Sequence, residues 1–123
     1  MTVWQIDLPI TRPLNLNGRE HWRVKAKAVK AIREATTQLV RAANVPTLNN
    51  ISVELHYVPR DKRRRDPLNL VATLKPIEDG IVDAGVVPDD TPQYVKSIMP
   101  IIDAPNSSQP RIYFVIRDND SEL

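Results

Sequence analysis

The segment ISVELHY, residues 51–57, alternates apolar and polar side chains along its whole length. Successive side chains of a β-strand point to opposite faces, so this alternation predicts a half-buried strand with Ile51, Val53, Leu55 and Tyr57 in the core. His56 falls on the other face, where we expect a structural or solvent-facing role, as for His21. This strand is the clearest secondary-structure signal in the chain, and the other elements are placed around it.

Two elements are expected before this strand. Alternation over residues 3–8 predicts a first strand, which Pro9 and Pro13 end. A long amphipathic helix follows, capped by Asn15 or Asn17. Its apolar stripe recurs at helical spacing through Trp22, Ala26, Val29, Ile32, Thr36, Leu39 and Ala43.

The opposite side of this helix carries basic residues about one turn apart. They are Arg19, Arg23, Lys27 and Lys30. Such a stripe can lie along a phosphate backbone, which makes these residues candidates for DNA binding. The alternative is an ordinary solvated helix face.

A second helix is expected to begin at Asp66 and Pro67, because aspartate accepts hydrogen bonds from the first turn and proline suits the first helical position. Its buried stripe is predicted to be Leu70, Leu74, Ile77 and Ile81. Pro76 removes one backbone donor, so we expect a kink or break over residues 72–76. Gly85 is expected to end the helix.

Two more strands are predicted, from about residue 94 to 102 and from 111 to 117, joined as a hairpin by a turn rich in Asn, Ser and Pro. The order β-α-β-α-β-β indicates an α+β fold, a mixed four-stranded sheet packed with two main helices. Residues 1–117 are expected to form a single domain, and residues 118–123 a frayed acidic tail.

Composition excludes several classes of protein. No apolar run approaches the roughly 20 residues that span a bilayer, so a membrane protein is not expected. The start of the chain has no basic region or apolar core typical of a secretion signal, so we expect a cytoplasmic protein. There are no cysteines, hence neither a disulfide framework nor a cysteine-ligated zinc site. Oxygen ligands remain the plausible metal donors.

Residues 60–70, RDKRRRDPLNL, set cations beside carboxylates, and further acids follow at Asp79, Asp83 and the pair at 89 and 90. The net charge is only +2, so any attraction to nucleic acid must come from how the charges are arranged. An enzyme that cleaves a phosphodiester needs both signs together, cations for phosphate and carboxylates for Mg²⁺. This arrangement favours a nuclease.

Roles within that site follow from side-chain chemistry. Arg63, Arg64 and Arg65 are placed to hold phosphate. Asp66 and Asp90 are the predicted pair that holds Mg²⁺, and Lys75 could stabilise the extra negative charge of the transition state. The structural alternatives are a helix cap for Asp66, a turn for the paired aspartates, and for Lys75 an ion pair one helical turn away.

The stretch from Arg63 to Asp90 resembles the RusA family of Holliday junction resolvases, which is common in phages and prophages. The resemblance covers roughly residues 1–117 in layout. Its specific part is a run of arginines, an Asp-x-Asp-Asn motif, a lysine, a further aspartate, Ala-Gly and paired aspartates. In this chain they correspond to Arg63–Arg65, Asp66, Asn69, Lys75, Asp79, Ala84-Gly85 and Asp89-Asp90.

This resemblance implies a homodimer that binds four-way DNA junctions and nicks two opposed strands, with Mg²⁺, or Mn²⁺ in its place, held by aspartates of each subunit. The departure is Leu68, which stands where the motif has its second aspartate and cannot coordinate a hard cation. Two alternatives follow: Asp89, Asp79 or Asp83 supplies the missing oxygen, or the site is impaired.

Three functions are therefore kept open. The first is a Mg²⁺-dependent endodeoxyribonuclease that resolves four-way junctions during recombination, repair or phage DNA processing, in a bacterial or phage-infected cell. The second is a branched-DNA-binding protein that does not cleave, because its metal site is impaired at Leu68. The third is a small protein-interaction domain whose charges keep it soluble.

Overall fold

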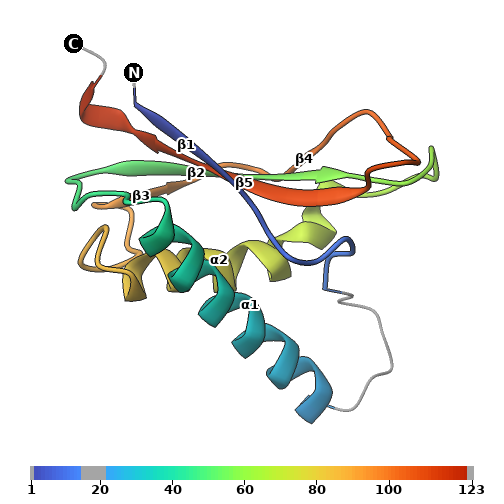
Figure 1. Ribbon diagram of the computed structural model, residues 1–123, viewed down its shortest axis with the longest axis horizontal. Helices are drawn as coiled ribbons and strands as arrows, with labels where there is room; N and C mark the ends of the chain where they lie inside the picture. The colour runs from blue at the N-terminus through green and yellow to red at the C-terminus, as the bar shows by residue number, and fades with distance from the viewer. Residues whose placement is uncertain (1, 15–21, 122–123) are drawn as a thin grey trace.

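The computed structural model describes residues 2–14 and 22–121. Within them, a five-stranded mixed sheet carries two helices on one face (Figure 1). Its strands are β1 (Val3–Asp7), β2 (Ile51–Val58), β3 (Val95–Ser97), β4 (Ile101–Ile102) and β5 (Arg111–Asp118). The helices are α1 (Trp22–Ala42) and α2 (Val71–Asp83), with short 3₁₀ turns η1 (Pro67–Leu70) and η2 (Asn119–Ser121).

The predicted α+β class is confirmed, and β2 is the central strand. Ile51, Val53 and Leu55 are fully buried and Tyr57 nearly so, as the alternation predicted. β5 pairs with β2 in antiparallel orientation on one side, and β1 pairs with the far edge of β5. The outer face of the sheet, where His56 lies, is not covered by a helix (Figure 1).

The predicted number of strands and the predicted final hairpin are wrong. The segment expected to form one strand over residues 94–102 is divided into β3 and β4, and both pair with β2 in parallel orientation rather than with β5. Pro100 lies in the interruption and has no N–H for a strand ladder. Because α2 connects β2 to β3, the chain returns in the same direction, as helical crossovers do.

α1 packs on the sheet through only part of its length. Ile32, Thr36 and Val40 are buried, but Trp22 is 67% exposed and Val29 38% exposed. The predicted apolar stripe is therefore wrong in its first half, because that half of α1 extends beyond the sheet (Figure 1). The predicted caps Asn15 and Asn17 lie outside the described residues.

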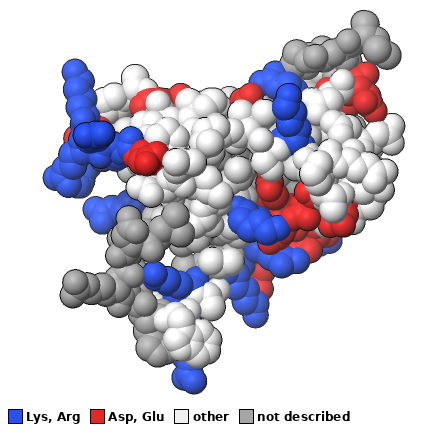
Figure 2. Space-filling model, turned by 180° about the vertical axis from the view of Figure 1, so that it is seen from behind, with Lys and Arg blue, Asp and Glu red and all other residues white. Residues whose placement is uncertain are grey.

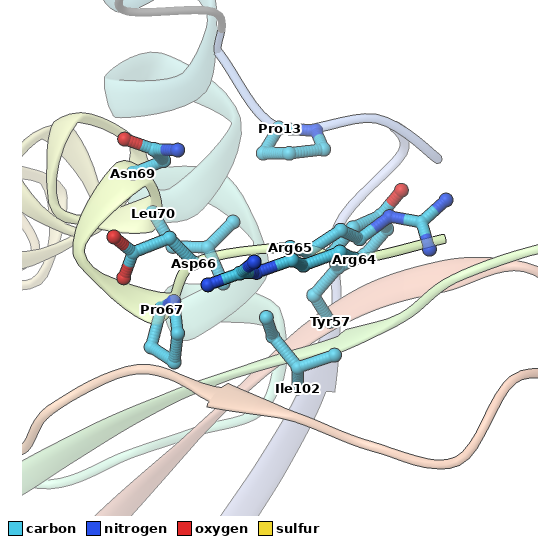
Figure 3. Close-up of a pocket in the computed structure, with 9 residues that line it drawn as sticks. All are labelled: Pro13, Tyr57, Arg64, Arg65, Asp66, Pro67, Asn69, Leu70 and Ile102. Atoms are coloured by element: carbon cyan, nitrogen blue, oxygen red, sulfur yellow. The ribbon is translucent and has the colours of Figure 1, made fainter. Parts of the chain in front are cut away.

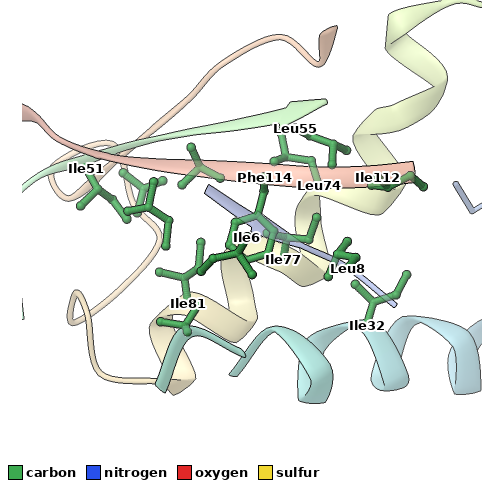
Figure 4. Packing of buried hydrophobic residues seen from close by; sticks show 14 of the residues in the cluster. Ile6, Leu8, Ile32, Ile51, Leu55, Leu74, Ile77, Ile81, Ile112 and Phe114 are labelled. Atoms are coloured by element: carbon green, nitrogen blue, oxygen red, sulfur yellow. The ribbon is translucent and has the colours of Figure 1, made fainter. Parts of the chain in front are cut away.

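α2 packs as predicted, with Leu70, Leu74, Ile77 and Ile81 buried. Of the kink or break predicted over residues 72–76, the break is not found, since α2 runs from Val71 to Asp83 with Pro76 inside it. Gly85 ends the helix with a φ of +86°, and its N–H donates to the carbonyl of Val82 at 2.9 Å. The four buried residues Leu70, Leu74, Ile77 and Ile81 form one core with Phe114, between the sheet and the helices (Figure 4).

The predicted frayed tail does not begin at Asp118. This residue ends β5, and the next residue, Asn119, is anchored to the start of β2. Its Nδ2 donates to Asn50 at 2.6 Å, and its Oδ1 accepts from Ser52 at 2.9 Å. In the described part of the chain, no helix has both the length and the apolar content needed to cross a membrane.

Candidate functional site

The loop between β2 and η1 is held in shape by a clasp of Asp61 and Arg65. The Arg65 guanidinium donates to Asp61 Oδ1 at 2.8 Å and to the carbonyls of Asp61 and Arg63 at 2.9 and 3.0 Å. It also lies over the ring of Tyr57, 5.6 Å from the centroid. The bond to Asp61 raises the pKa of Arg65. Arg65, predicted to hold phosphate, thus makes three hydrogen bonds within the loop.

The clasp also sets the charge state of Asp61. A hydrogen bond from the Arg63 backbone N–H, followed by the one from Arg65, lowers the pKa of Asp61. The Arg63 side chain lies 3.4 Å from the same carboxylate but remains 77% exposed. Asp61 was not among the predicted site residues, although its position four residues before Arg65 is a recognisable ion-pair spacing.

Next to the clasp lies a pocket of about 660 Å³, which we call the arginine pocket (Figure 3). Asp66 and Asn69 lie on its helical side, and Arg64 and Arg65 come from the loop. Arg64 is exposed and makes no hydrogen bond or ion pair with any described residue, so it is the arginine available to a ligand. The lining residues are Pro13, Tyr57, Arg64, Arg65, Asp66, Pro67, Asn69, Leu70 and Ile102.

Asp66 has the capping role that the sequence allowed. Its Oδ1 accepts the N–H of Leu68 at 3.0 Å, and Pro67 occupies the first position of η1. Leu68 itself is 57% exposed. Asp66 and Asn69 thus both line the arginine pocket.

A second charged group lies farther along α2, and we call it the Lys75 cluster, made of Lys75, Asp79 and Asp90. The ammonium of Lys75 donates to Asp79 Oδ1 at 3.0 Å and to Asp90 Oδ2. These bonds, the one to Asp90 first, raise the pKa of Lys75 to about 12. The same contact lowers the pKa of Asp90.

The neighbouring acids have other partners. Asp89 Oδ1 accepts the backbone N–H of Asp90 at 2.8 Å, which fixes the turn. Asp83 accepts two bonds from Arg33 of α1, at 2.6 and 2.9 Å, so it is not available to replace a ligand missing at Leu68. Arg33 also reaches Asp79, at 4.0 Å.

The structure does not join Asp66 to Asp90 within one chain. With a rise of about 2 Å per residue in η1 and 1.5 Å in α2, Asp66 and Lys75 are separated by roughly 15 Å along the helix axis. Among the described residues, neither Lys75 nor Asp90 makes a hydrogen bond or an ion pair with Asp66. No three histidine, aspartate or glutamate side chains gather as a metal site within residues 2–14 and 22–121.

Two of the predicted metal ligands do converge. Asp79 and Asp90 meet at a single cation, the Lys75 ammonium, on a partly exposed surface. Mg²⁺ is commonly held by one or two carboxylates together with substrate phosphates, so these two side chains fit it in number and chemistry. Asp66 and Asp89 are not part of this pair.

Glu78 is an acid that the sequence analysis did not select. Its side chain is nearly buried, at 7% exposure, and it accepts a hydrogen bond from the Ser97 hydroxyl of β3. Burial raises the pKa of Glu78, and the negative charges of Asp90 and Asp79 act in the same direction. Its position next to Asp79 was visible in the sequence, but its burial was not.

We expect Glu78→Gln to stabilise the protein at pH 7. The folded state holds the Glu78 proton more tightly than the unfolded state, so stability falls as pH rises from the ordinary value of 4.5 through the raised one. Glutamine does not ionise, so it removes this pH-dependent loss of stability, and its side-chain oxygen still accepts a hydrogen bond from Ser97. Urea denaturation at pH 4 and pH 7 would test this: an advantage that is equal at both values would rule out the charge as its cause.

The predicted basic stripe of α1 is not part of the arginine pocket. Arg19 lies outside the described residues. Arg23 lies over the ring of Trp22, 5.3 Å from its centroid, and Lys30 approaches Glu34 at 3.9 Å. Lys27 is exposed. None of these three lines the pocket.

Figure 2 shows the distribution of charge on the face turned away from the viewer in Figure 1. Cationic side chains gather at the end of the molecule where the loop after β2 lies, and acidic side chains gather on the other side of this face. The two signs predicted to be crowded together are thus partly separated in space.

Comparison with known proteins gives a distant relative and no family. No family model matches the chain. It is 30% identical over 79 residues to an uncharacterized protein of Xylella fastidiosa (strain Temecula1), an alignment that covers 60% of this chain and 52% of the relative. The chain thus spans about half the length of the curated relative it matches.

Proposed function

We propose that this protein is a Mg²⁺-dependent endodeoxyribonuclease that acts on branched DNA, with the four-way junction as its substrate, as the resemblance to RusA implies. The observation that carries the proposal is the Lys75 cluster, in which two carboxylates converge on one cation at the protein surface. Stability alone does not require two carboxylates to converge in this way, because an exposed ion pair contributes little to the free energy of unfolding.

The arginine pocket supplies the second part of the proposed site. Arg64 has free donors for a phosphate, and the Asn69 amide faces the same space. Asn69 and Lys75 are six residues apart, about 9 Å along the helix. One DNA strand that crosses this surface could therefore contact both the pocket and the Lys75 cluster.

Within this proposal, Asp79 and Asp90 would hold the metal. When bound, Mg²⁺ or Mn²⁺ polarises a phosphate and makes a bound water more acidic. The ordinary lysine pKa of 10.5 already keeps Lys75 charged at physiological pH, so its ammonium can offset negative charge that develops on the phosphate. Arg64 and Asn69 position the strand.

Paired nicks in a junction require two such sites, so the proposal includes a homodimer. The resemblance implies metal ligands from each subunit. Asp66, which one chain does not bring to Asp79 and Asp90, would then join their metal site from the other subunit of the dimer.

A nicking assay tests the function. Purified protein is incubated with a labelled four-way junction or a linear duplex of the same sequence, with Mg²⁺ or with EDTA. We expect nicks in opposed strands of the junction only, and only with the metal. Binding in both solutions with no nick in either would refute the enzyme.

The second candidate is a protein that binds branched DNA without cutting it. It is favoured by the separation of Asp66 from the Lys75 cluster and by the exposed Leu68 at the motif position of an aspartate. It predicts a salt-sensitive gel shift and no product. If this candidate is right, Leu68→Asp restores the aspartate of the motif, and this variant would be tested for cleavage.

Arg64→Gln is expected to weaken DNA binding and to lower the slope of log affinity against log salt by about 0.9, the value for one phosphate contact. Fluorescence anisotropy over a range of KCl concentrations measures both quantities. Lys96→Gln is the matched control. Lys96 is exposed on β3 and does not line the pocket, so this substitution removes the same charge at a different place. Equal slopes for the two variants would exclude Arg64 from the interface.

A further inference from the structure

We propose that a second cavity, on the other side of the Asp61–Arg65 clasp, binds another backbone phosphate of the same DNA. We call it the Arg12 cavity. It has a volume of about 390 Å³ and is formed where the segment after β1 meets the loop after β2. The inference rests on the proposed function, since it extends the contact surface of that substrate.

The charge of the cavity favours an anion. Four arginines line it, Arg12, Arg60, Arg63 and Arg65, against the single acid Asp61. Asp61 is already bound to Arg65 and approached by Arg63. Arg12 and Arg60 are exposed and make no hydrogen bond or ion pair with any described residue. Within residues 2–14 and 22–121, nothing engages the donors of these two guanidinium groups, which can therefore bind an anion.

The position of the cavity relates it to the arginine pocket. Pro13, Tyr57 and Arg65 line both spaces, so the Arg65 guanidinium above the Tyr57 ring is a shared wall. Because the clasp fixes this wall, the two cavities keep a constant position relative to each other. Arg64 serves one side, and Arg12 and Arg60 serve the other.

This arrangement also assigns a role to Asp61. It keeps Arg65 in the wall rather than in either cavity, so it is a positioning residue for both phosphate sites. Thr11, which also lines the Arg12 cavity, adds a hydroxyl that can donate to a phosphate oxygen.

The experiment uses the full chain with the variants Arg12→Gln, Arg60→Gln and both together. Anisotropy with a labelled four-way junction is measured over a range of KCl concentrations. Each single change is expected to lower the salt slope by about 0.9 and the double change by about twice that. Lys96→Gln serves as the charge control. Slopes like that of the control in all three variants would overturn the inference.

A second measurement separates this inference from the proposed function. The arginine Nε–H signals of the wild type are followed by NMR during titration with inorganic phosphate. Shifts of the Arg12 and Arg60 signals, each reduced when the other arginine is replaced by glutamine, support the cavity even if the protein neither binds nor nicks junctions. The opposite result would be a protein that binds junctions, whose Arg12 and Arg60 signals do not move and whose variants have the salt slope of the wild type. The proposed function would then stand, but the Arg12 cavity would not take part in it.

Discussion

Asp90→Asn is expected to slow junction nicking on the order of 10²-fold or more, which is the usual cost of removing one strong electrostatic contact from an active site. Asparagine keeps the size of the side chain but removes one of the two charges that converge on Lys75. DNA binding should stay the same or tighten, because a negative charge near phosphate is lost. Single-turnover nicking rates and anisotropy, measured on the same preparation, separate the two effects.

The matched control is Asp120→Asn, which makes the same chemical change at an exposed residue of η2. It should nick at the wild-type rate. A wild-type rate for Asp90→Asn as well would remove Asp90 from catalysis. Loss of binding together with a lower melting temperature would instead make Asp90 a structural residue, which holds the turn through Lys75.

The strand β2 and the helix α2 could be predicted because each is decided by a local pattern. Alternation at residues 51–57 and spacing of three or four at Leu70, Leu74, Ile77 and Ile81 both identified residues that are buried. The end of α2 at Gly85 was predictable for the same reason, because a glycine with positive φ after the last helical turn is a local signal.

The order of strands could not be predicted in this way. β4 and β5 are neighbours in the sequence, but they pair with opposite edges of β2. This depends on competition among distant segments for the edges of one strand. Similarly, the periodicity of α1 indicates which side is apolar but not where the sheet beneath it ends, so Trp22 was wrongly placed in the core.

The candidate site shows the same division. The cap at Asp66 and the ion pair of Lys75 with Asp79 follow from local spacing, and both were open readings of the sequence. The sequence alone does not distinguish the three arginines at 63–65. In the structure, Arg65 belongs to the clasp and Arg64 has no partner among the described residues. That difference arises from Tyr57 and Asp61, whose side chains meet Arg65 only in the folded loop.

Gly80→Ala is expected to destabilise the protein, although alanine is the better helix former by about 1 kcal/mol. Gly80 lies where α2 meets α1, and a Cβ there would be 2.6 Å from the carbonyl oxygen of Arg33 and 2.7 Å from Cβ of Thr36. The nearest atom belongs to the backbone, so no side-chain rotation relieves the clash. Overpacking of this kind costs about 1–3 kcal/mol. Urea denaturation measures the change in the free energy of unfolding.

Ala72→Gly, elsewhere in α2, is the control that isolates helix propensity. It should lower stability by about 1 kcal/mol. If propensity alone mattered, the two substitutions would have opposite signs, whereas close packing of the helices makes both of them destabilising. The hydroxyl of Thr37, which donates to the Gly80 carbonyl at 2.9 Å, would be displaced by the same shift. An increase in stability for Gly80→Ala would show that α1 can move away from α2 at little cost, and that the contact at Gly80 does not fix their separation.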